Sequence, residues 1–435
     1  MTPDTQRPSV TPMTRSISPF HLYLRMSGLF LLVLLVGVAG GIIIGRETMG
    51  TSRQETTSDV DAVTGVLMNN YYYRPTSDED RVRFETTLEQ HAISGMLASL
   101  NDDYTRYLPP EQAQIAASEL EGEYGGVGLT LQEVGGLVSV ARVGPDSPAD
   151  RAGITPGDIV ERIDNRPVSS IDEDFNGKDL TGPVGSTVDI TLVKDANGDP
   201  MTVTVEREVV IVHQVTWEMV PGTTYMRIVV DIFGDRTISE LDAALAEAEA
   251  NGATGLILDL RGNGGGWVKS AQETIGRFLD DDVGPAMYED STPGRGDEVA
   301  IPILNGEVRP TDLPVIVLVD GSTASAAEIV AGSLRDYNRA LVIGLPTVGK
   351  GSVQRIFDFS DGASLRVTVA EWFTPSKGRI QDEGVRPDVL LTATDGSAAL
   401  GGDPYVSTAV SYLDAGSARP TDLATMPAGA TPTAG

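Results

Sequence analysis

Three short aliphatic runs in the second half of the chain contain almost no polar position. They are residues 255–260, 314–319 and 340–344. Strands that are apolar on both sides are typical of parallel sheets, where helices cover both faces. Apolar residues recur at helical spacing after the first two runs, which predicts helices over 268–279 and 326–337. The pattern therefore predicts an α/β domain built from strand–helix–strand units.

The hydrophobic pattern is different in the first half of the chain. Helical spacing predicts helices over 59–73, 78–100 and 111–120, whose apolar positions we expect to serve packing or a dimer contact. Between 121 and 208 the pattern changes to short alternating strands, which predicts a separate β-rich domain. These strands are expected at 127–132, 137–143, 158–163, 187–193 and 201–206.

Residues 26–45 form an apolar run without a charge, long enough to cross a bilayer as one helix. Arg7, Arg15 and Arg25 precede the run, and this basic excess predicts that the N-terminus lies in the cytoplasm. A cleaved signal peptide is the alternative, because Val38-Ala39-Gly40 offers small residues. Under either interpretation residues 50–435 lie outside the cytoplasm. We predict a single-pass cell-membrane protein with its folded part on the periplasmic or cell-surface side.

Composition and charge exclude several chemistries. The 435 residues predict more than one domain, and a formal net charge of −30 argues against nucleic acid as a partner. The absence of cysteine removes disulfides and thiol nucleophiles, and three histidines make a histidine metal site or a Ser-His-Asp triad unexpected. We therefore expect no metal and no cofactor.

Ser325 stands at the predicted start of the helix that follows the apolar run 314–319. The sequence Ser325-Ala326-Ala327-Glu328 matches a capping box, which is a purely structural interpretation and a common one. The same position also suits a nucleophile, because backbone N–H groups converge on developing negative charge at a helix N-terminus. The N–H of Ala326 would then donate to an oxyanion.

A serine nucleophile needs a base, and Lys350 is the best candidate in a chain with so little histidine. A free lysine is neutral only about 0.04% of the time at pH 7, but burial lowers its pKa. The neighbours of Lys350 are uncharged, although a surface lysine in a turn is the alternative. Gln354 follows four residues later, and in an extended segment it would lie roughly 13 Å away. A contact between the two therefore requires a turn.

Two glycine-rich segments imitate nucleotide-binding loops. Residues 344–351 fit a P-loop until Gly351 replaces the serine or threonine that would hold magnesium. Residues 262–267 imitate a dinucleotide loop but carry Trp267 in place of the third glycine. We favour neither nucleotide function. The glycines of the second segment can instead supply a further oxyanion donor, and Gly265 is the predicted one.

The segment Tyr124-Gly125-Gly126-Val127-Gly128-Leu129 can point successive backbone N–H groups at one anion. Together with Ser147-Pro148-Ala149 and Gly182-Pro183-Val184-Gly185, it resembles a PDZ domain. The resemblance implies a domain that binds an extended protein C-terminus as an added strand. Gly125, Gly126, Val127 and Gly128 would surround the terminal carboxylate.

Four motifs follow in order behind the PDZ-like segment: LDLRGNGGG, GSTASAAEIVAGSLRDYNRALVIG, TVGKGSVQ and TPSKGR…GVRPDV. With GMLASLNDDYTRYLPPEQ upstream, the chain from about Tyr71 to Val389 resembles the C-terminal processing (tail-specific) peptidases. The resemblance implies a serine endopeptidase in which Ser325 is the nucleophile, Lys350 the general base and Gln354 orients the lysine. It implies flexible or unfolded protein C-termini as substrates and is compatible with a homo-oligomer.

The chain is thus predicted to be an α/β multidomain protein with a crotonase/Clp-like protease core. The expected segments are a cytoplasmic disordered segment (1–25), a transmembrane helix (26–45), a helical region (55–120), a PDZ domain (121–208), the protease core (209–393) and a short helix with a disordered tail (394–435).

Three positions depart from the pattern of the family it resembles. Gly264 stands where many members have proline, Thr181 where an arginine often precedes the PDZ Gly-Pro pair, and Lys377 is an insertion. The first two motivate an alternative function, a PDZ scaffold or chaperone with a degenerate protease domain. None of the three positions belongs to the Ser-Lys pair.

Overall fold

The structure is a computed structural model that describes residues 59–168, 178–194, 198–292, 295, 297–306, 308–391 and 403–423. The predicted segments 1–25 and 26–45 lie outside these ranges. Within them, no helix has both the length and the apolar character needed to cross a bilayer. The chain divides into two units at 96/97, and each unit is described separately.

The first unit is helical, as the sequence predicted. It contains α2 (Asp59–Asn70) and all but the last two residues of α3 (Asp78–Ala98), and both helices end slightly earlier than expected. Met68 is the only buried residue of α2, and no residue of α3 is buried.

A six-stranded sheet forms the centre of the second unit, with strand order β10-β11-β12-β15-β16-β19. Its strands pair in parallel, except for the antiparallel pair β10–β11. The predicted aliphatic runs form its middle. The strands are β10 (Val215–Met219), β11 (Tyr225–Val230), β12 (Gly255–Asp259), β15 (Val315–Val319), β16 (Ala340–Gly344) and β19 (Val389–Leu390).

Helices cover both faces of this sheet, which explains why its central strands have no polar side. Alternate strand residues such as Val317 pack in one core with α6 (Thr237–Ala250), α7 (Val268–Ile275) and α8 (Ala326–Asp336). Their neighbours, such as Ile316, pack in another core with α9 (Pro404–Asp414). The short helix α10 (Pro420–Leu423) follows α9.

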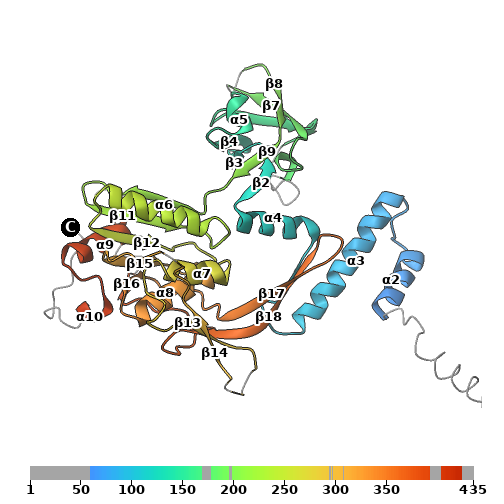
Figure 1. Cartoon of the computed structure of the whole chain (residues 1–435). Helices are drawn as coiled ribbons and strands as arrows, with labels where there is room; N and C mark the ends of the chain where they lie inside the picture. The colour runs from blue at the N-terminus through green and yellow to red at the C-terminus, as the bar shows by residue number, and fades with distance from the viewer. Residues whose placement is uncertain are drawn as a thin grey trace, which may run out of the picture. The chain divides into compact units, whose positions relative to one another are not determined.

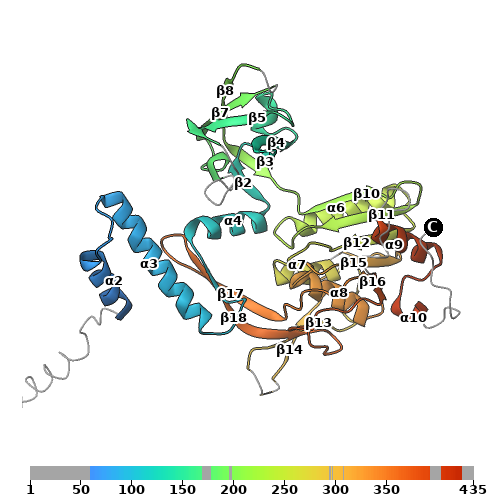
Figure 2. The ribbon, with the colours of Figure 1, turned by 180° about the vertical axis from the view of Figure 1, so that it is seen from behind.

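A second sheet consists of antiparallel strands, and the sequence predicted it only in part. Figures 1 and 2 show its two long strands, β17 and β18, running side by side. The predicted strand pair at 363–373 is a single strand, and its neighbour in the chain, β17, was missed. β1 was missed as well, because its partner β18 is distant in sequence. The strands are β1 (Arg106–Leu108), β13 (Pro285–Asp290), β14 (Val299–Pro302), β17 (Ser352–Asp358) and β18 (Ser364–Phe373).

The β-rich segment has its own hydrophobic core, with members from Val127 to Val205. One sheet has the order β3-β4-β5-β7-β8 with β6 beside β5, and a separate pair joins β2 to β9. The helix α4 (Pro110–Glu121) precedes it, as predicted. The elements are β2 (Glu123–Gly126), β3 (Leu129–Val134), β4 (Leu137–Val143), α5 (Pro148–Arg151), β5 (Ile159–Ile163), β6 (Arg166–Pro167), η1 (Lys178–Leu180), β7 (Thr187–Val193), β8 (Met201–Glu206) and β9 (Glu208–Ile211).

Candidate active site

Ser325 lies between the end of β15 and the start of α8, in a turn that side chains brace. The Asp320 carboxylate accepts hydrogen bonds from the N–H groups of Ser322 (2.9 Å) and Gly262 (3.1 Å). The Thr323 hydroxyl donates to the carbonyl of Leu260 at 2.9 Å. The turn after β15 is thereby tied to the loop that follows the neighbouring strand β12.

The backbone of Ser325 is strained. Its φ of 55° and ψ of −117° are a sparsely populated combination for a residue with a side chain, costing on the order of 1–3 kcal/mol. Nucleophilic serines of α/β-hydrolases occupy a comparable sharp strand-to-helix turn. Since the chain has no G-x-S-x-G motif, sequence reasoning had no signal for this conformation.

Glu328 links the turn at 320–325, called the serine turn below, to the loop at 345–351 that carries Lys350. Its buried carboxylate accepts hydrogen bonds from the backbone N–H groups of Ser325 (2.7 Å), Gly349 (2.7 Å) and Lys350 (2.9 Å), and from the Thr347 hydroxyl. The glutamate half of the predicted capping box is therefore formed, and the same carboxylate also holds residues 347–350. Burial raises the pKa of the Glu328 carboxyl, while these hydrogen bonds act in the opposite direction.

Lys350 lies on the loop between β16 and β17. Its Nζ donates to Gln354 Oε1 at 3.1 Å and lies 5.5 Å from the centre of the Tyr104 ring. The Gln354 amide donates to the carbonyl of Tyr104. A register shift between Val353 and Gln354 breaks the regular extension of β17, and the two side chains meet despite their separation along the chain.

The surroundings of Lys350 favour its neutral form. Burial is the largest cause that lowers the pKa of its amine, followed by the positive charges of Arg106 and Arg366. The carboxylates of Glu328 and Asp102 act in the opposite direction without cancelling the shift. A neutral amine is the form that can accept a proton from a serine hydroxyl.

Ser325, Lys350 and Gln354 line one cavity of about 400 Å³. Gly264, Gly265 and Gly266 form another part of its wall. Apolar side chains complete the lining on the side of α8 and the antiparallel sheet; they are Ile329, Val353, Ile356 and Trp372. The sequence-predicted catalytic residues thus come together at one concave surface, which has room for a peptide side chain.

The glycine loop shows why the predicted oxyanion donor Gly265 must be revised. The N–H of Gly265 already donates to Asn263 Oδ1 at 2.8 Å. An added Cβ on Gly265 would lie 2.7 Å from Ser325 Cβ, so glycine is needed for the close approach. Across the described ranges, the N–H groups of Gly266 and Ala326 have no partner. Gly266 is therefore the better candidate, together with Ala326.

The loop 344–351 does not resemble a phosphate cradle in space. The N–H groups of Gly349 and Lys350 donate to Glu328, whereas a P-loop leaves such groups free for phosphate oxygens.

The candidate carboxylate loop of the β-rich segment comprises Gly125, Gly126, Val127 and Gly128. Gly125 and Gly126 belong to β2, and Gly126 also forms an isolated antiparallel bridge with Thr181. The N–H group of Gly128 has no partner within the described part of the chain. Gly128 has a φ of 78°, and an added Cβ would lie 2.3 Å from Ser147 Cβ. The following strand β3 pairs with β4 alone among the described strands, which leaves one edge for an added strand.

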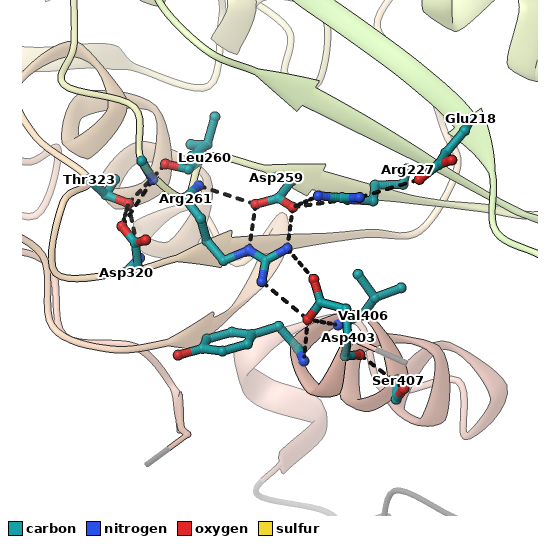
Figure 3. A network of polar contacts seen from close by, with 12 residues as sticks. Glu218, Arg227, Asp259, Leu260, Arg261, Asp320, Thr323, Asp403, Val406 and Ser407 are labelled. Atoms are coloured by element: carbon teal, nitrogen blue, oxygen red, sulfur yellow. Dashed lines mark hydrogen bonds and ion pairs between the residues drawn. The ribbon is translucent and has the colours of Figure 1, made fainter. Parts of the chain in front are cut away.

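Sequence reasoning missed a charged network at the end of β12 (Figure 3). The buried Asp259 carboxylate accepts hydrogen bonds from the guanidinium groups of Arg227 and Arg261, both at 2.7 Å or less at their closest. Arg261 also donates to Asp403 at 2.6 Å and lies over the Tyr405 ring. The network fixes the start of the glycine loop and attaches α9. The only sequence signal was Asp259-x-Arg261 at the end of a strand.

Two regions of the chain match described protein families. Residues 224–391 match "Peptidase family S41" and residues 139–176 match "PDZ domain". These matches, with the serine turn and the cavity, define the class as a serine peptidase that carries a PDZ domain.

Relatives of known name agree with this class. The chain is 30% identical over 387 residues to a probable CtpA-like serine protease of Staphylococcus epidermidis, covering 88% of this chain and 76% of that protein. It is 30% identical over 362 residues to a carboxy-terminal-processing protease of Bartonella bacilliformis, covering 82% and 80%. A solved photosystem II D1 C-terminal processing protease is 30% identical, with 72% and 86% covered and a TM-score of 0.42. The chain belongs to the carboxy-terminal-processing serine proteases of peptidase family S41, and it is a hydrolase.

Proposed function

We propose that Ser325 is the nucleophile and Lys350 the general base of this protease. The observation that supports this most directly is the Glu328 carboxylate, which accepts hydrogen bonds from the backbone of both residues at one cavity. The lowered pKa of the Lys350 amine adds to it, because only a neutral amine can take the serine proton.

In the proposed reaction the Ser325 hydroxyl attacks the carbonyl carbon of the scissile peptide bond. Lys350 Nζ takes the hydroxyl proton and passes it to the leaving amine. The N–H groups of Ala326 and Gly266 stabilise the negative oxygen of the tetrahedral intermediate. Water then attacks the acyl-serine, Lys350 accepts a proton from the water, and Ser325 recovers its hydrogen.

Gln354 has a positioning role in this proposal. Its side-chain oxygen accepts from Lys350 Nζ while its amide is anchored on the Tyr104 carbonyl. The amine is therefore held at a fixed place on the cavity wall. Since small misplacements of a catalytic group cost much of the rate, this anchoring is worth a substantial factor.

The PDZ domain is proposed to select the substrate by its C-terminus. The N–H group of Gly128, which has no partner among the described residues, would bind the terminal carboxylate, and the open edge of β3 would pair with the residues before it. The expected substrates are flexible or unfolded protein C-termini.

The cellular site is a separate proposal that depends on the sequence. The uncharged run 26–45 and the basic residues before it support a single membrane-spanning helix, with the protease outside the cytoplasm. Extraction of the full chain from membranes by carbonate would contradict this anchor.

The test compares the wild-type chain with Ser325→Ala and with Ser322→Ala. Ser322 lies exposed in the same turn and contacts Asp320 only through its backbone, so it is a matched control. Each protein is incubated with an unstructured protein that ends in apolar residues, and fragments are identified by mass spectrometry. We expect wild type and Ser322→Ala to cleave and Ser325→Ala to be inactive. Cleavage by Ser325→Ala at the wild-type rate would refute the assignment.

A scaffold or chaperone with a degenerate protease domain is the second candidate, favoured by the Thr181 and Gly264 departures. It predicts that pure wild type hydrolyses nothing yet still binds peptides with a free C-terminal carboxylate. Calorimetry with acid and amidated peptides, run beside the cleavage assay, separates the two functions.

A further inference from the structure

Two arginines face each other at the wall of the catalytic cavity. Arg106 of β1 and Arg366 of β18 are direct partners in the antiparallel register, so their side chains lie on the same face of the sheet. Both line the cavity together with Ser325 and Lys350. Like charges placed opposite each other destabilise a sheet, and such departures from local rules concentrate at functional sites.

Neither guanidinium has a counter-ion among the residues that the structure describes. In the part of the chain that the structure describes, no hydrogen bond or ion pair involves the side chain of Arg106 or Arg366. The Nε of Arg366 is buried and has no partner. Burial, followed by the charge of Arg106, lowers the pKa of the Arg366 guanidinium. Glu119 acts in the opposite direction from the same cavity but forms no ion pair with it.

We propose that Arg106 and Arg366 form an anion subsite that binds one carboxylate of the substrate chain close to the scissile bond. A guanidinium presents a planar fork of donors that matches a carboxylate. On a protein with a formal net charge of −30, such a local pair also offsets the general repulsion of acidic substrates. The inference rests on the proposed function, because it takes this cavity as the place where the peptide bond is hydrolysed.

The carboxylate has two sources within a polypeptide. It is either the side chain of an aspartate or glutamate near the cleaved bond, or the terminal carboxylate of a short substrate. Both have the same chemistry, and a set of peptides distinguishes them. Glu119 competes with either, so Glu119→Gln should strengthen the effect.

The experiment starts from a glutamine-rich peptide that the full-length chain cleaves in detergent solution. Glutamine is exchanged for glutamate at each position from four residues before to four after the cleaved bond. Each peptide is made with a free and with an amidated C-terminus. The measured quantity is the ratio of kcat/KM between the charged and neutral member of a pair, which cancels any general effect of a variant on Lys350.

Arg366→Met and Arg106→Met are compared with Arg355→Met. Arg355 is exposed on the adjacent strand β17 and does not line the cavity, so its variant controls for a lost positive charge in the same sheet. For wild type and Arg355→Met we expect kcat/KM to be about tenfold higher for glutamate at one position, or for the free C-terminus, than for the neutral peptide. The reason is that a charge-assisted hydrogen bond contributes about one tenfold step. In Arg366→Met and Arg106→Met the preference should fall to about twofold or less.

Two results would overturn the subsite. One is a wild-type ratio near one at every position and for both termini; the other is a preference that Arg366→Met and Arg106→Met both retain. Failure of the proposed function looks different, because no peptide would be cleaved by any protein. In that case the Kd of each charged and each neutral peptide is measured for Ser325→Ala, with and without Arg366→Met. A ratio of these two Kd values that changes when Arg366 is replaced still supports the subsite, and a ratio that does not change refutes it.

Discussion

Replacement of Glu328 by glutamine tests the central feature of the proposed site, the carboxylate that holds both the turn of Ser325 and the loop of Lys350. One oxygen of Glu328 accepts from Ser325 and Lys350, and the other from Thr347 and Gly349. Glutamine keeps one acceptor oxygen and places an NH2 group against two donors. Loss of two charge-assisted hydrogen bonds costs about 3 kcal/mol at the lower end of their usual range. For a domain of this size that lowers the unfolding midpoint by about 6–12 °C.

The catalytic effect of Glu328→Gln should exceed what its stability predicts. A displacement of about 1 Å in the loop of Lys350 or Ser325 is expected to lower kcat/KM roughly 100-fold. The pH profile provides a second readout. Because the negative charge of Glu328 raises the pKa of the Lys350 amine, the acid limb of any residual activity should move to lower pH.

Glu240→Gln is the matched control for this prediction. Glu240 is also buried, and its carboxylate accepts from the backbone N–H groups of Gln214 and Val215, away from the cavity. We expect a similar loss of thermal stability with kcat/KM within about threefold of wild type, since neither the turn of Ser325 nor the loop of Lys350 moves. The reasoning is refuted if Glu328→Gln retains wild-type kcat/KM, or if both variants lose activity equally.

Three further predictions concern the lysine, its glutamine partner and the charged network. Burial and two arginines lower the pKa of Lys350, so kcat/KM should rise with pH through a limb centred below the value of about 10.4 for free lysine. Lys350→Arg stays protonated and should be inactive at every pH. Activity in this variant would count against Lys350 as the general base. Gln354→Leu removes the acceptor of the Lys350 amine and should lower kcat about tenfold with little change in KM. Gln354→Glu keeps an acceptor for the amine and should move the acid limb of the pH profile to higher pH. An unchanged kcat in Gln354→Leu would exclude the positioning role of Gln354. Arg261→Met leaves the buried Asp259 with Arg227 alone and frees Asp403. Denaturation by urea should show a loss of about 1.5–3 kcal/mol in the free energy of unfolding, the range for hydrogen bonds to charged groups, and a loss under about 0.5 kcal/mol would mean that the network contributes little.

Much of the α/β core followed from local sequence alone. The runs that became β12, β15 and β16 have no polar position apart from Asp259 at the end of β12, and this pattern is sufficient for a strand buried on both faces. The start of α8 at Ala326 and of α4 at Pro110 followed from local signals as well, a capping box and a proline in the first turn. Such features depend on neighbouring residues only, and neighbouring residues are what a sequence shows directly.

Pairings between distant segments could not be predicted in this way. β1 consists of three residues and exists because Arg106–Leu108 pairs with β18, more than 250 positions away in the chain. Neither strand has an alternation strong enough to indicate its partner. The face-to-face placement of Arg106 and Arg366 was therefore invisible before the fold was known.

The sequence by itself determined the identity of Ser325, Lys350 and Gln354 as candidates, because their residue types and motif order carry the chemistry. Only the tertiary structure decided how they are held: the strained backbone of Ser325, the Glu328 carboxylate between the two loops and the register shift beside Gln354. It also showed that the N–H of Gly265 already donates to Asn263, which is why we propose Gly266 in its place as the second oxyanion donor. Hydrogen-bond partners and buried charges depend on distances between remote segments, and those distances are set when the sheets pair and the cores pack.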